Sequence, residues 1–343
     1  MINSQSEDTS RIRIHQIYFD KSQAPFLDPD FVPYFNKKND RPDWREYHIL
    51  RSAYNGGQIC SNDITGYVSW KFGKKAKISG KAFIKFIKDN PNHDVYFINP
   101  FPFIAATHQN VWHQGEECHP GISDLTQYIL SRAGYKIDLS NMFMDETHFA
   151  FCNFWAGTRS FWDRYMAFTE PLYDIVENQL SSHEKQMLLS CADKMSGASF
   201  PPYIFERLFS TFLVLNPDIK KIHFQFDDLK DRLKGSYIHY QNLSIMKELH
   251  RTQKQPTYHQ FEIVLKNYQA CYSELSLIRE HIADIYQARG RIEKMSTLLL
   301  KFTYFVRKHS ALHIFFCFFL NIYRRLNKKS QYELNNNELR WSR

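Results

Sequence analysis

The sequence predicts an α/β fold in which helices flank a sheet, followed by an α-helical C-terminal extension. Residues 11–19 alternate apolar and polar side chains and are rich in β-branched and aromatic types, as is typical of a strand. Two apolar, aromatic runs at residues 64–70 and 95–98 predict two more strands, and the basic amphipathic pattern of residues 79–88 predicts a helix between them. Because ligands of open α/β sheets bind beyond the carboxyl ends of the strands, this strand–helix–strand unit indicates where a small anionic ligand would bind.

The same patterns assign the other elements. Pro201 and Pro202 suit the first turn of a helix, and apolar residues recur at helical spacing between residues 160 and 180. We expect helices at residues 44–54, 122–133, 160–180 and 203–215, a short strand at 149–155 and a polar loop at 108–121.

Composition limits the functional class. The 343-residue chain carries a formal net charge of +8 and 16% aromatic residues, which fits a folded protein with an anionic partner. Nucleic acid is the least favoured partner, because the sequence has no zinc-finger or RRM signature and no base-reading basic helix. Six cysteines without a CxxC pair, after a polar and acidic N-terminus, favour reduced thiols and no signal peptide, and hence a cytoplasmic location.

Composition also divides the chain. We expect a disordered leader at residues 1–10, a globular domain at 11–240, a helical, coiled-coil-like spacer at 241–296 and a basic amphipathic tail at 297–343. The spacer has apolar residues close to heptad spacing and could form a homodimer seam. The cleanest apolar run of the tail, residues 311–323, is shorter than the roughly 20 residues that span a bilayer. Its basic flanks favour a helix lying on an anionic membrane surface, with a buried terminal helix as the alternative.

Polar residues mark the ends of the predicted strands. Ser69 and Lys71 stand where the run 64–70 ends, and Asn99 follows the run 95–98. Lys71 could neutralise a diphosphate in the absence of a metal ion, although taken alone its position is better explained by a solvent-facing strand end. Asp28 and Asp30 form a DxD, a spacing that can hold a metal ion, but a proline-rich turn also accounts for it.

The polar segment around residue 115 is a second candidate region. Zinc could be held by its side chains, but their spacing matches no standard ligand pattern. A substrate-contacting loop and a plain surface loop are the other interpretations. The side chains concerned are His108, His113, Glu116, Cys118 and His119.

Two acidic positions are candidates for acid–base chemistry. Glu206 and Arg207 lie within the apolar segment 203–215, where they would form either a structural ion pair or a pair directed into a cleft. Asp145 and Glu146 precede the predicted strand at 149–155, where acids either form a turn or contact sugar hydroxyls.

Six segments, taken in order over residues 11–215, resemble a bacterial polysaccharide glycosyltransferase family of GT-A-like character that acts in O-antigen and capsule synthesis. They are IHQIYFD, DITGYVSWKF, DVYFINPFP, NVWHQGEECHPG, CNFWAGTRSFWDRYMAFTEPL and YIFERLFSTFL. The resemblance implies a Rossmann-type mixed sheet, a nucleotide-sugar donor and a glycan acceptor on a lipid carrier. A well-placed DxD is missing, so no metal ligand is assigned, and a need for Mg²⁺ or Mn²⁺ stays open.

The residues and the resemblance together predict a cytoplasmic glycosyltransferase, peripheral on the inner face of the membrane. Glu206, Glu116 or Asp145 would deprotonate the acceptor hydroxyl if the reaction inverts. The residues expected to bind the donor are His15, Gln16, Tyr18, Asp63, Ser69, Lys71 and Asn99. Those expected to contact the acceptor or sugar are Gln114, His119, Glu146, Asn153 and Arg207. The rival hypothesis is a non-catalytic, membrane-tethered scaffold of a polysaccharide biosynthesis complex.

Overall fold

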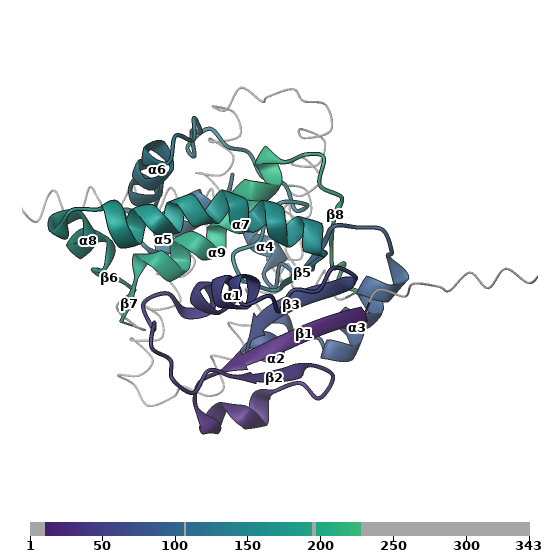
Figure 1. Ribbon diagram of the computed structural model, residues 1–343. Helices are drawn as coiled ribbons and strands as arrows, with labels where there is room; N and C mark the ends of the chain where they lie inside the picture. Colours follow the sequence, from purple (N-terminus) through teal and green to yellow (C-terminus); the bar gives the residue numbers. More distant parts are fainter. Residues whose placement is uncertain (1–10, 106–107, 194–196, 228–343) are drawn as a thin grey trace, which may run out of the picture. The chain divides into compact units, whose positions relative to one another are not determined.

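The structure, a computed structural model, describes residues 11–105, 108–193 and 197–227 (Figure 1). The leader, the spacer, the tail and the last residues of the predicted globular domain lie outside the described residues. The helices are η1 (Lys21–Phe26), α1 (Arg45–Asn55), α2 (Phe72–Ala76), α3 (Gly80–Asp89), α4 (Pro102–Ala105), α5 (Val111–Cys118), α6 (Ile122–Arg132), α7 (Arg159–Asp174), η2 (Ile175–Gln179), α8 (Ser182–Leu188) and α9 (Phe200–Leu215). The strands are β1 (Arg11–Tyr18), β2 (Val32–Phe35), β3 (Asp63–Ser69), β4 (Val95–Phe97), β5 (Trp155–Gly157), β6 (Cys191–Asp193), β7 (Ala198–Ser199) and β8 (Lys221–His223).

Six of the described strands form one mixed sheet, as the predicted α/β fold requires. Their order is β2-β1-β3-β5-β4-β8, and β6 with β7 forms a separate two-stranded ribbon. All neighbours in the large sheet are parallel except β5, which runs antiparallel to both β3 and β4. Gly66 permits this insertion, because a Cβ at that position would lie 2.5 Å from the carbonyl oxygen of Trp155. The carboxyl ends of β1, β3 and β4 therefore share one edge of the sheet with the start of β5.

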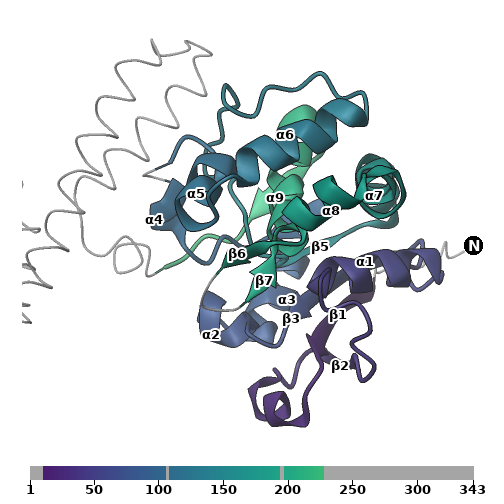
Figure 2. The ribbon, with the colours of Figure 1, turned by 90° about the vertical axis from the view of Figure 1, so that its left-hand side faces the viewer.

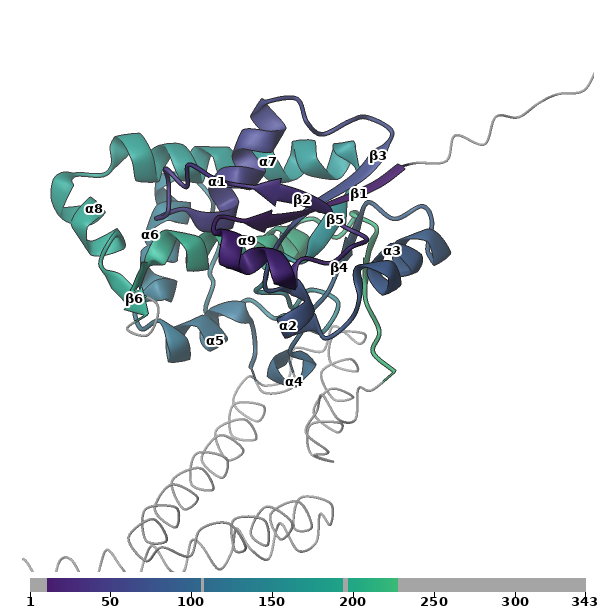
Figure 3. The same ribbon diagram turned by 90° about the horizontal axis from the view of Figure 1, so that it is seen from below.

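Helices cover both faces of the sheet. Figure 1 shows α1, α7 and α9 over one face, and in Figure 3 the strands lie between α7 and the pair α2 and α3. On the first face Trp162 of α7 packs against Tyr67 and its indole Nε1 donates to the carbonyl oxygen of Thr65 at 3.0 Å. On the second face Phe72 of α2 contacts the rings of Phe83 and Phe154. Buried aromatic rings thus form the core on either side of β3 and β5.

The helix α5 corrects the prediction of a polar loop at residues 108–121. Asn110 caps the helix, with its Oδ1 accepting hydrogen bonds from the backbone N–H groups of Trp112 and His113, both at 2.9 Å. The indole of Trp112 is buried and donates to Thr211 Oγ1 of α9 at 2.9 Å. Figure 2 shows α5 and α6 beside α9. A few buried contacts thus outweigh the polar composition of this segment.

The short strand predicted at residues 149–155 lies further along the chain, because β5 covers only Trp155–Gly157. The preceding segment is instead pinned to α9, where Ser210 Oγ donates to Ala150 O at 2.6 Å and accepts from Ala150 N at 2.8 Å. A tight turn follows, in which Phe154 N–H donates to Cys152 O at 2.7 Å. This irregular segment brings Cys152 and Asn153 to the carboxyl edge of the sheet.

The other predicted elements agree with the structure within a few residues. Helices at 44–54, 79–88, 122–133 and 203–215 correspond to α1, α3, α6 and α9. Pro201 and Pro202 occupy the first turn of α9 as expected. The helix predicted at 160–180 is α7, whose last turn continues as the π-helical η2.

Candidate functional site

A cluster of ionisable side chains lies at the carboxyl edge of the sheet. Lys75 comes from α2, directly after β3; Cys152 precedes β5; and Glu206 with Arg207 comes from the N-terminal half of α9. This half of α9 lies toward the carboxyl edge, because the helix returns the chain to the amino end of β8. Lys75 Nζ donates to Cys152 Sγ at 3.6 Å. We call these four residues the edge cluster.

Glu206 has an unusual protonation equilibrium. Burial penalises its charged form and raises its pKa to about 7, against the opposing positive charges of Lys75 and Arg207. Its neighbour Glu46, at the start of α1, raises it further. A carboxyl group with a pKa near neutrality can both accept and return a proton at physiological pH. Glu206 is therefore the strongest candidate for a general base among the three predicted acids.

The shifted pKa values of Cys152 and Lys75 keep the thiol neutral and the amine charged at physiological pH. Burial, with the negative charge of Glu206, raises the pKa of the Cys152 thiol to about 12, so this thiol is protonated and a poor nucleophile. Burial lowers the pKa of Lys75, but Cys152, Glu206 and Glu46 outweigh it and the pKa ends above its usual range. Lys75 is thus a half-buried cation beside a carboxyl group that is only partly ionised.

Arg207 points away from the sheet edge, toward α5. The side chain is 2% exposed, and its Nε donates to Val111 O at 3.0 Å while a terminal nitrogen donates to Gln114 Oε1 at 2.6 Å. Gly115 makes room for it, because a Cβ there would lie 2.8 Å from Arg207 Nε. Arg207 and Gln114 therefore join α9 to α5 and supply a fixed positive charge next to Glu206.

Two stacked rings lie next to the edge cluster. The rings of His119 and Tyr203 stack with their centroids 3.8 Å apart, and His119 Nδ1 lies 3.0 Å from Ala192 O. The guanidinium of Arg45 lies 5.7 Å from the centroid of the Tyr203 ring. Arg45 opens α1 with a φ of 45°, a left-handed conformation that costs a non-glycine residue free energy. Of the predicted acceptor contacts, Gln114, His119 and Arg207 are thus brought together.

The other two predicted acids already act as local structural groups. Glu116 accepts backbone hydrogen bonds from Gly121 at 2.5 Å and from Ser123 at 3.1 Å, which caps the start of α6. Asp145 Oδ1 accepts from the backbone and the hydroxyl of Thr147 and lies 2.8 Å from His148 Nδ1. The neighbouring Glu146 is half-buried in the same turn. The engaged lone pairs of Asp145 suit the turn-forming alternative, and those of Glu116 give it a structural role at the start of α6.

The predicted donor residues are spread along the sheet. Ser69 and Asn99 are buried at the carboxyl edge, and Lys71 is exposed there with its Nζ 5.3 Å from the centroid of Trp70. Asp63 begins β3 at the opposite edge, about 20 Å from Ser69 at the usual rise per residue, and pairs with Arg13 at 2.7 Å. The structure therefore does not bring Asp63 to the edge cluster.

The remaining donor residues make contacts within the sheet. His15 stacks on Tyr67 in mid-strand with ring centroids 4.5 Å apart, and Tyr18 stacks on Phe35 at 4.7 Å. Gln16 is buried, and its Oε1 accepts from the backbone of Asp28 at 2.6 Å.

The DxD at residues 28–30 serves the fold. Asp28 Oδ2 accepts from the backbone N–H of Gly80 at the start of α3 at 2.7 Å, and Asp28 Oδ1 accepts from Asp30 N at 3.0 Å. Over residues 11–105, 108–193 and 197–227 no group of three or more His, Cys, Asp or Glu side chains is arranged to hold a metal ion. His108, one of the proposed zinc ligands, lies instead with its Nε2 3.0 Å from Glu117 Oε2.

Lys75 and Cys152 were not predicted from the sequence. Lys75 belongs to the lysine-rich stretch FGKKAK, where one helical turn separates it from the predicted Lys71. Helical spacing could have shown that Lys75 lies on the same side of α2 as the buried Phe72, whereas Lys74 does not. The burial of Cys152 depends on the irregular segment before β5, for which the sequence has no periodic signal.

Comparisons with models of protein families, with curated proteins and with solved structures give no match to this chain. The helices of the described part of the chain include none with the length and apolar character needed to cross a membrane.

Proposed function

We propose that the protein is a glycosyltransferase that moves a sugar from a nucleotide-sugar donor to a hydroxyl group of a glycan acceptor. The observation that carries this proposal is the edge cluster, in which a carboxyl group with a pKa of about 7 lies beside a half-buried lysine at the ligand-binding edge of an α/β sheet. Glycosyl transfer to a hydroxyl needs a base for the hydroxyl proton and a positive charge for the departing diphosphate. Glu206 and Lys75 supply these two functions.

The reaction is a displacement at the anomeric carbon. Glu206 takes the proton of the acceptor hydroxyl as its oxygen bonds to the anomeric carbon, and the bond from that carbon to the diphosphate oxygen breaks. The electron pair leaves with the nucleoside diphosphate, whose added negative charge Lys75 stabilises. With one carboxylate as base and the leaving group on the opposite side, the anomeric configuration inverts.

Two further features support the proposal. The sheet is mixed, with β5 reversed among parallel neighbours, as the GT-A-like resemblance implies. Three of the similar segments also supply residues of the cluster or its support, namely Gln114, Cys152 and Glu206. Lys75 takes the role first expected of Lys71, because Lys71 is exposed beside Trp70 whereas Lys75 faces Cys152.

The proposed setting is the cytoplasmic face of a membrane that carries the lipid-linked acceptor. This part of the proposal rests on the sequence of residues 297–343, whose apolar stretch has basic flanks. A homodimer through residues 241–296 belongs to the same proposal. Truncation after about residue 296 should release the protein from anionic vesicles and leave nucleotide binding intact.

Thermal unfolding with nucleoside diphosphates tests the proposal. The full-length protein should unfold at a higher midpoint with saturating UDP, GDP or ADP, because a ligand that binds only the native state stabilises it by about 2.7 kcal/mol at 100 times its Kd. The rise should survive EDTA at least in part, since no metal ligand set is assigned. The variant Lys75→Met should lose most of the rise. If none of these nucleotides shifts the wild-type midpoint, the scaffold hypothesis replaces the transferase.

A further inference from the structure

Two buried asparagines lie at the carboxyl edge of the sheet, Asn99 after β4 and Asn153 before β5. The last pair of β4 with β5 joins Phe97 to Trp155. The two segments are still joined beyond these strands, because Ile98 N–H donates to Phe154 O at 2.9 Å. Asn99 and Asn153 each adjoin one partner of this hydrogen bond, Asn153 within the tight turn before β5, so the two asparagines lie close to each other.

Each of these asparagines buries a polar atom that has no partner in the described part of the chain. Asn99 is 5% exposed, and its Oδ1 accepts from the backbone N–H of Phe101 at 3.0 Å, which orients the amide and leaves Nδ2 without an acceptor. Asn153 is 8% exposed, and its Oδ1 has no donor. One neighbour thus presents an unsatisfied donor and the other an unsatisfied acceptor. Leaving such groups unpaired in a protein interior is unfavourable and is a feature of sites that bind a ligand.

We infer that Asn99 and Asn153 form a subsite for a hydroxyl group of a sugar. A hydroxyl group both accepts and donates a hydrogen bond, so a single one satisfies Asn99 Nδ2 and Asn153 Oδ1 together. The subsite adjoins the edge cluster, because Cys152, the residue before Asn153, contacts Lys75. It deepens the proposed function, on which it rests, by assigning the recognition of the sugar to this pair. Such a site should select against the analogue that lacks the hydroxyl, since its polar atoms would then stay unpaired.

The variant Asn153→Leu tests the subsite, with Asn110→Leu as the matched control. Asn110 is 1% exposed, and both of its amide atoms are bonded: Nδ2 to Leu139 O and Met142 O, and Oδ1 to two backbone N–H groups. Replacing this satisfied asparagine should lower the thermal midpoint of the full-length protein. Asn153→Leu removes an unsatisfied acceptor and should raise the midpoint, by about 2–4 °C. A purely structural asparagine would behave like Asn110.

Sugar binding is the second readout. The midpoint of the wild type is measured with glucose, galactose, mannose and N-acetylglucosamine and with their deoxy analogues, each up to about 0.1 M. At least one hydroxylated sugar should raise the wild-type midpoint saturably, its matching deoxy analogue should not, and Asn153→Leu should abolish the rise. General exclusion of sugars from the protein surface raises all variants alike and cancels in the comparison. Asn99→Asp, which keeps the oxygen that accepts from Phe101 and loses the donor, should also abolish the rise.

Three results would overturn the subsite. Asn153→Leu could unfold at a lower midpoint, as Asn110→Leu does, which would show that Asn153 is satisfied in the free protein by a bound water or a structural contact. The saturable rise could persist in Asn153→Leu and Asn99→Asp, or no sugar could shift the wild type. These outcomes are read with sugars alone, whereas failure of the transferase proposal appears with nucleoside diphosphates, so the two failures are distinguishable.

Discussion

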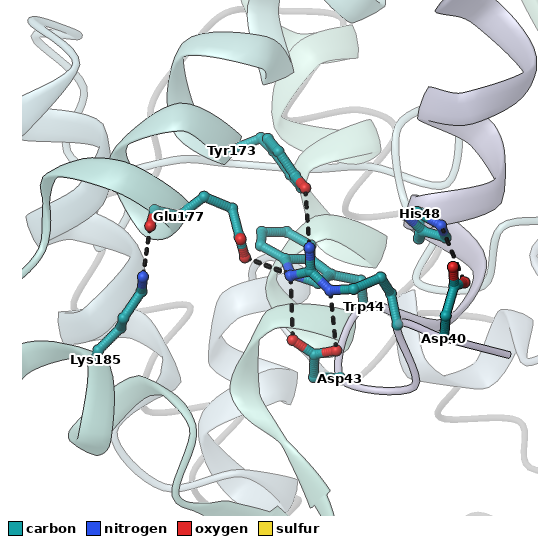
Figure 4. Close-up of polar contacts among 8 residues, drawn as sticks. Asp40, Asp43, Trp44, His48, Tyr173, Glu177 and Lys185 are labelled. Atoms are coloured by element: carbon teal, nitrogen blue, oxygen red, sulfur yellow. Dashed lines mark hydrogen bonds and ion pairs between the residues drawn. The ribbon is translucent and has the colours of Figure 1, made fainter. Parts of the chain in front are cut away.

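Two charged regions of the molecule use the same residue types in opposite ways. Between α1 and α7, Arg51 contacts the carboxylate of Glu170 through Nε at 3.0 and 2.9 Å and through a terminal nitrogen at 2.5 Å. One turn beyond α7, Glu177 accepts from Arg41 at 2.5 Å and from the indole of Trp44 at 2.8 Å (Figure 4). We call this arrangement the α1–α7 seam. In the edge cluster, by contrast, none of the described residues donates a hydrogen bond to the carboxylate of Glu206.

The pKa shifts in the two regions differ in their cause. In the seam the hydrogen bond to Glu170 raises the pKa of Arg51 and so stabilises its charged form. In the edge cluster burial acts against the charged form of Glu206. Charges held by matched partners fix α1 against α7, whereas an acid kept partly protonated at the carboxyl edge of the sheet suits the proton transfer that we propose for Glu206. Glutamine substitutions in the two regions should therefore have opposite effects.

The largest expected effect is on the rate when Glu206 is replaced by Gln. The amide cannot accept the hydroxyl proton, so the transfer rate should fall by about 10²–10⁴-fold, the usual range for loss of a general base. The rate is measured as nucleoside diphosphate release from the nucleotide sugar that stabilises the wild type. In the wild type the rate should rise with pH through about 7, as Glu206 loses its proton.

This rising limb is the control for the role of Glu206. It should be absent from the residual activity of Glu206→Gln. A full rate in this variant, or the same rising limb, would remove Glu206 from the reaction and leave it as a buried structural acid.

The same variant should gain stability at high pH. The folded protein holds the Glu206 proton up to a pKa of about 7, whereas the unfolded chain loses it near the ordinary value of 4.5. Between these values the native state binds more protons, so the contribution of Glu206 to stability falls as pH rises through this window and stays low above it. Glu206→Gln removes this penalty, worth about 3 kcal/mol from the displacement of the pKa. Its gain in denaturant unfolding should be full at pH 8 and vanish near pH 4; an equal gain at both pH values would contradict the argument.

Lys75 and Lys71 are a half-buried and an exposed cation one helical turn apart. Lys75→Met should weaken nucleoside diphosphate binding by about 10–100-fold, because a charge-assisted hydrogen bond is worth roughly 1.5–3 kcal/mol. Lys71→Met should change the affinity by no more than about threefold, as befits an exposed side chain. Isothermal titration of both variants with a nucleoside diphosphate measures the two affinities. A larger loss for Lys71 would restore the role that the sequence alone assigns to it.

The fold was largely predictable, because its strands and helices carry local signals. The runs 11–19, 64–70 and 95–98 are apolar and aromatic enough to predict β1, β3 and β4. The helix α5 was missed because its sequence is mostly polar and its two stabilising residues were not recognised. Asn110 caps the helix, and Trp112 is buried with its indole hydrogen-bonded to Thr211 of α9. Tertiary contacts thus decided the structure where the local pattern was weakest.

The candidate site was predictable only in part. Glu206 was predicted because it is an acid within an apolar helical segment, which the local sequence shows. Lys75 did not, because its burial depends on Cys152 and Glu206, which are 77 and 131 positions away in the chain. Asp63 was predicted as a donor residue beside Ser69 and Lys71, but it begins β3 and so lies at the opposite end of that strand from Ser69.

The smallest expected effect comes from the α1–α7 seam, where Glu170→Gln is the counterpart of Glu206→Gln. Glu170→Gln removes one charge from the pair with Arg51, and the side chain of Glu170 is 41% exposed. Exposed pairs contribute up to about 1 kcal/mol, so the free energy of unfolding at pH 7 should fall by that amount at most, and the transfer rate of the folded protein should not change. Denaturant unfolding and rate assays run beside Glu206→Gln measure both. Stabilisation by Glu170→Gln, or a loss of rate like that of Glu206→Gln, would show that the seam and the edge cluster are not separate in function.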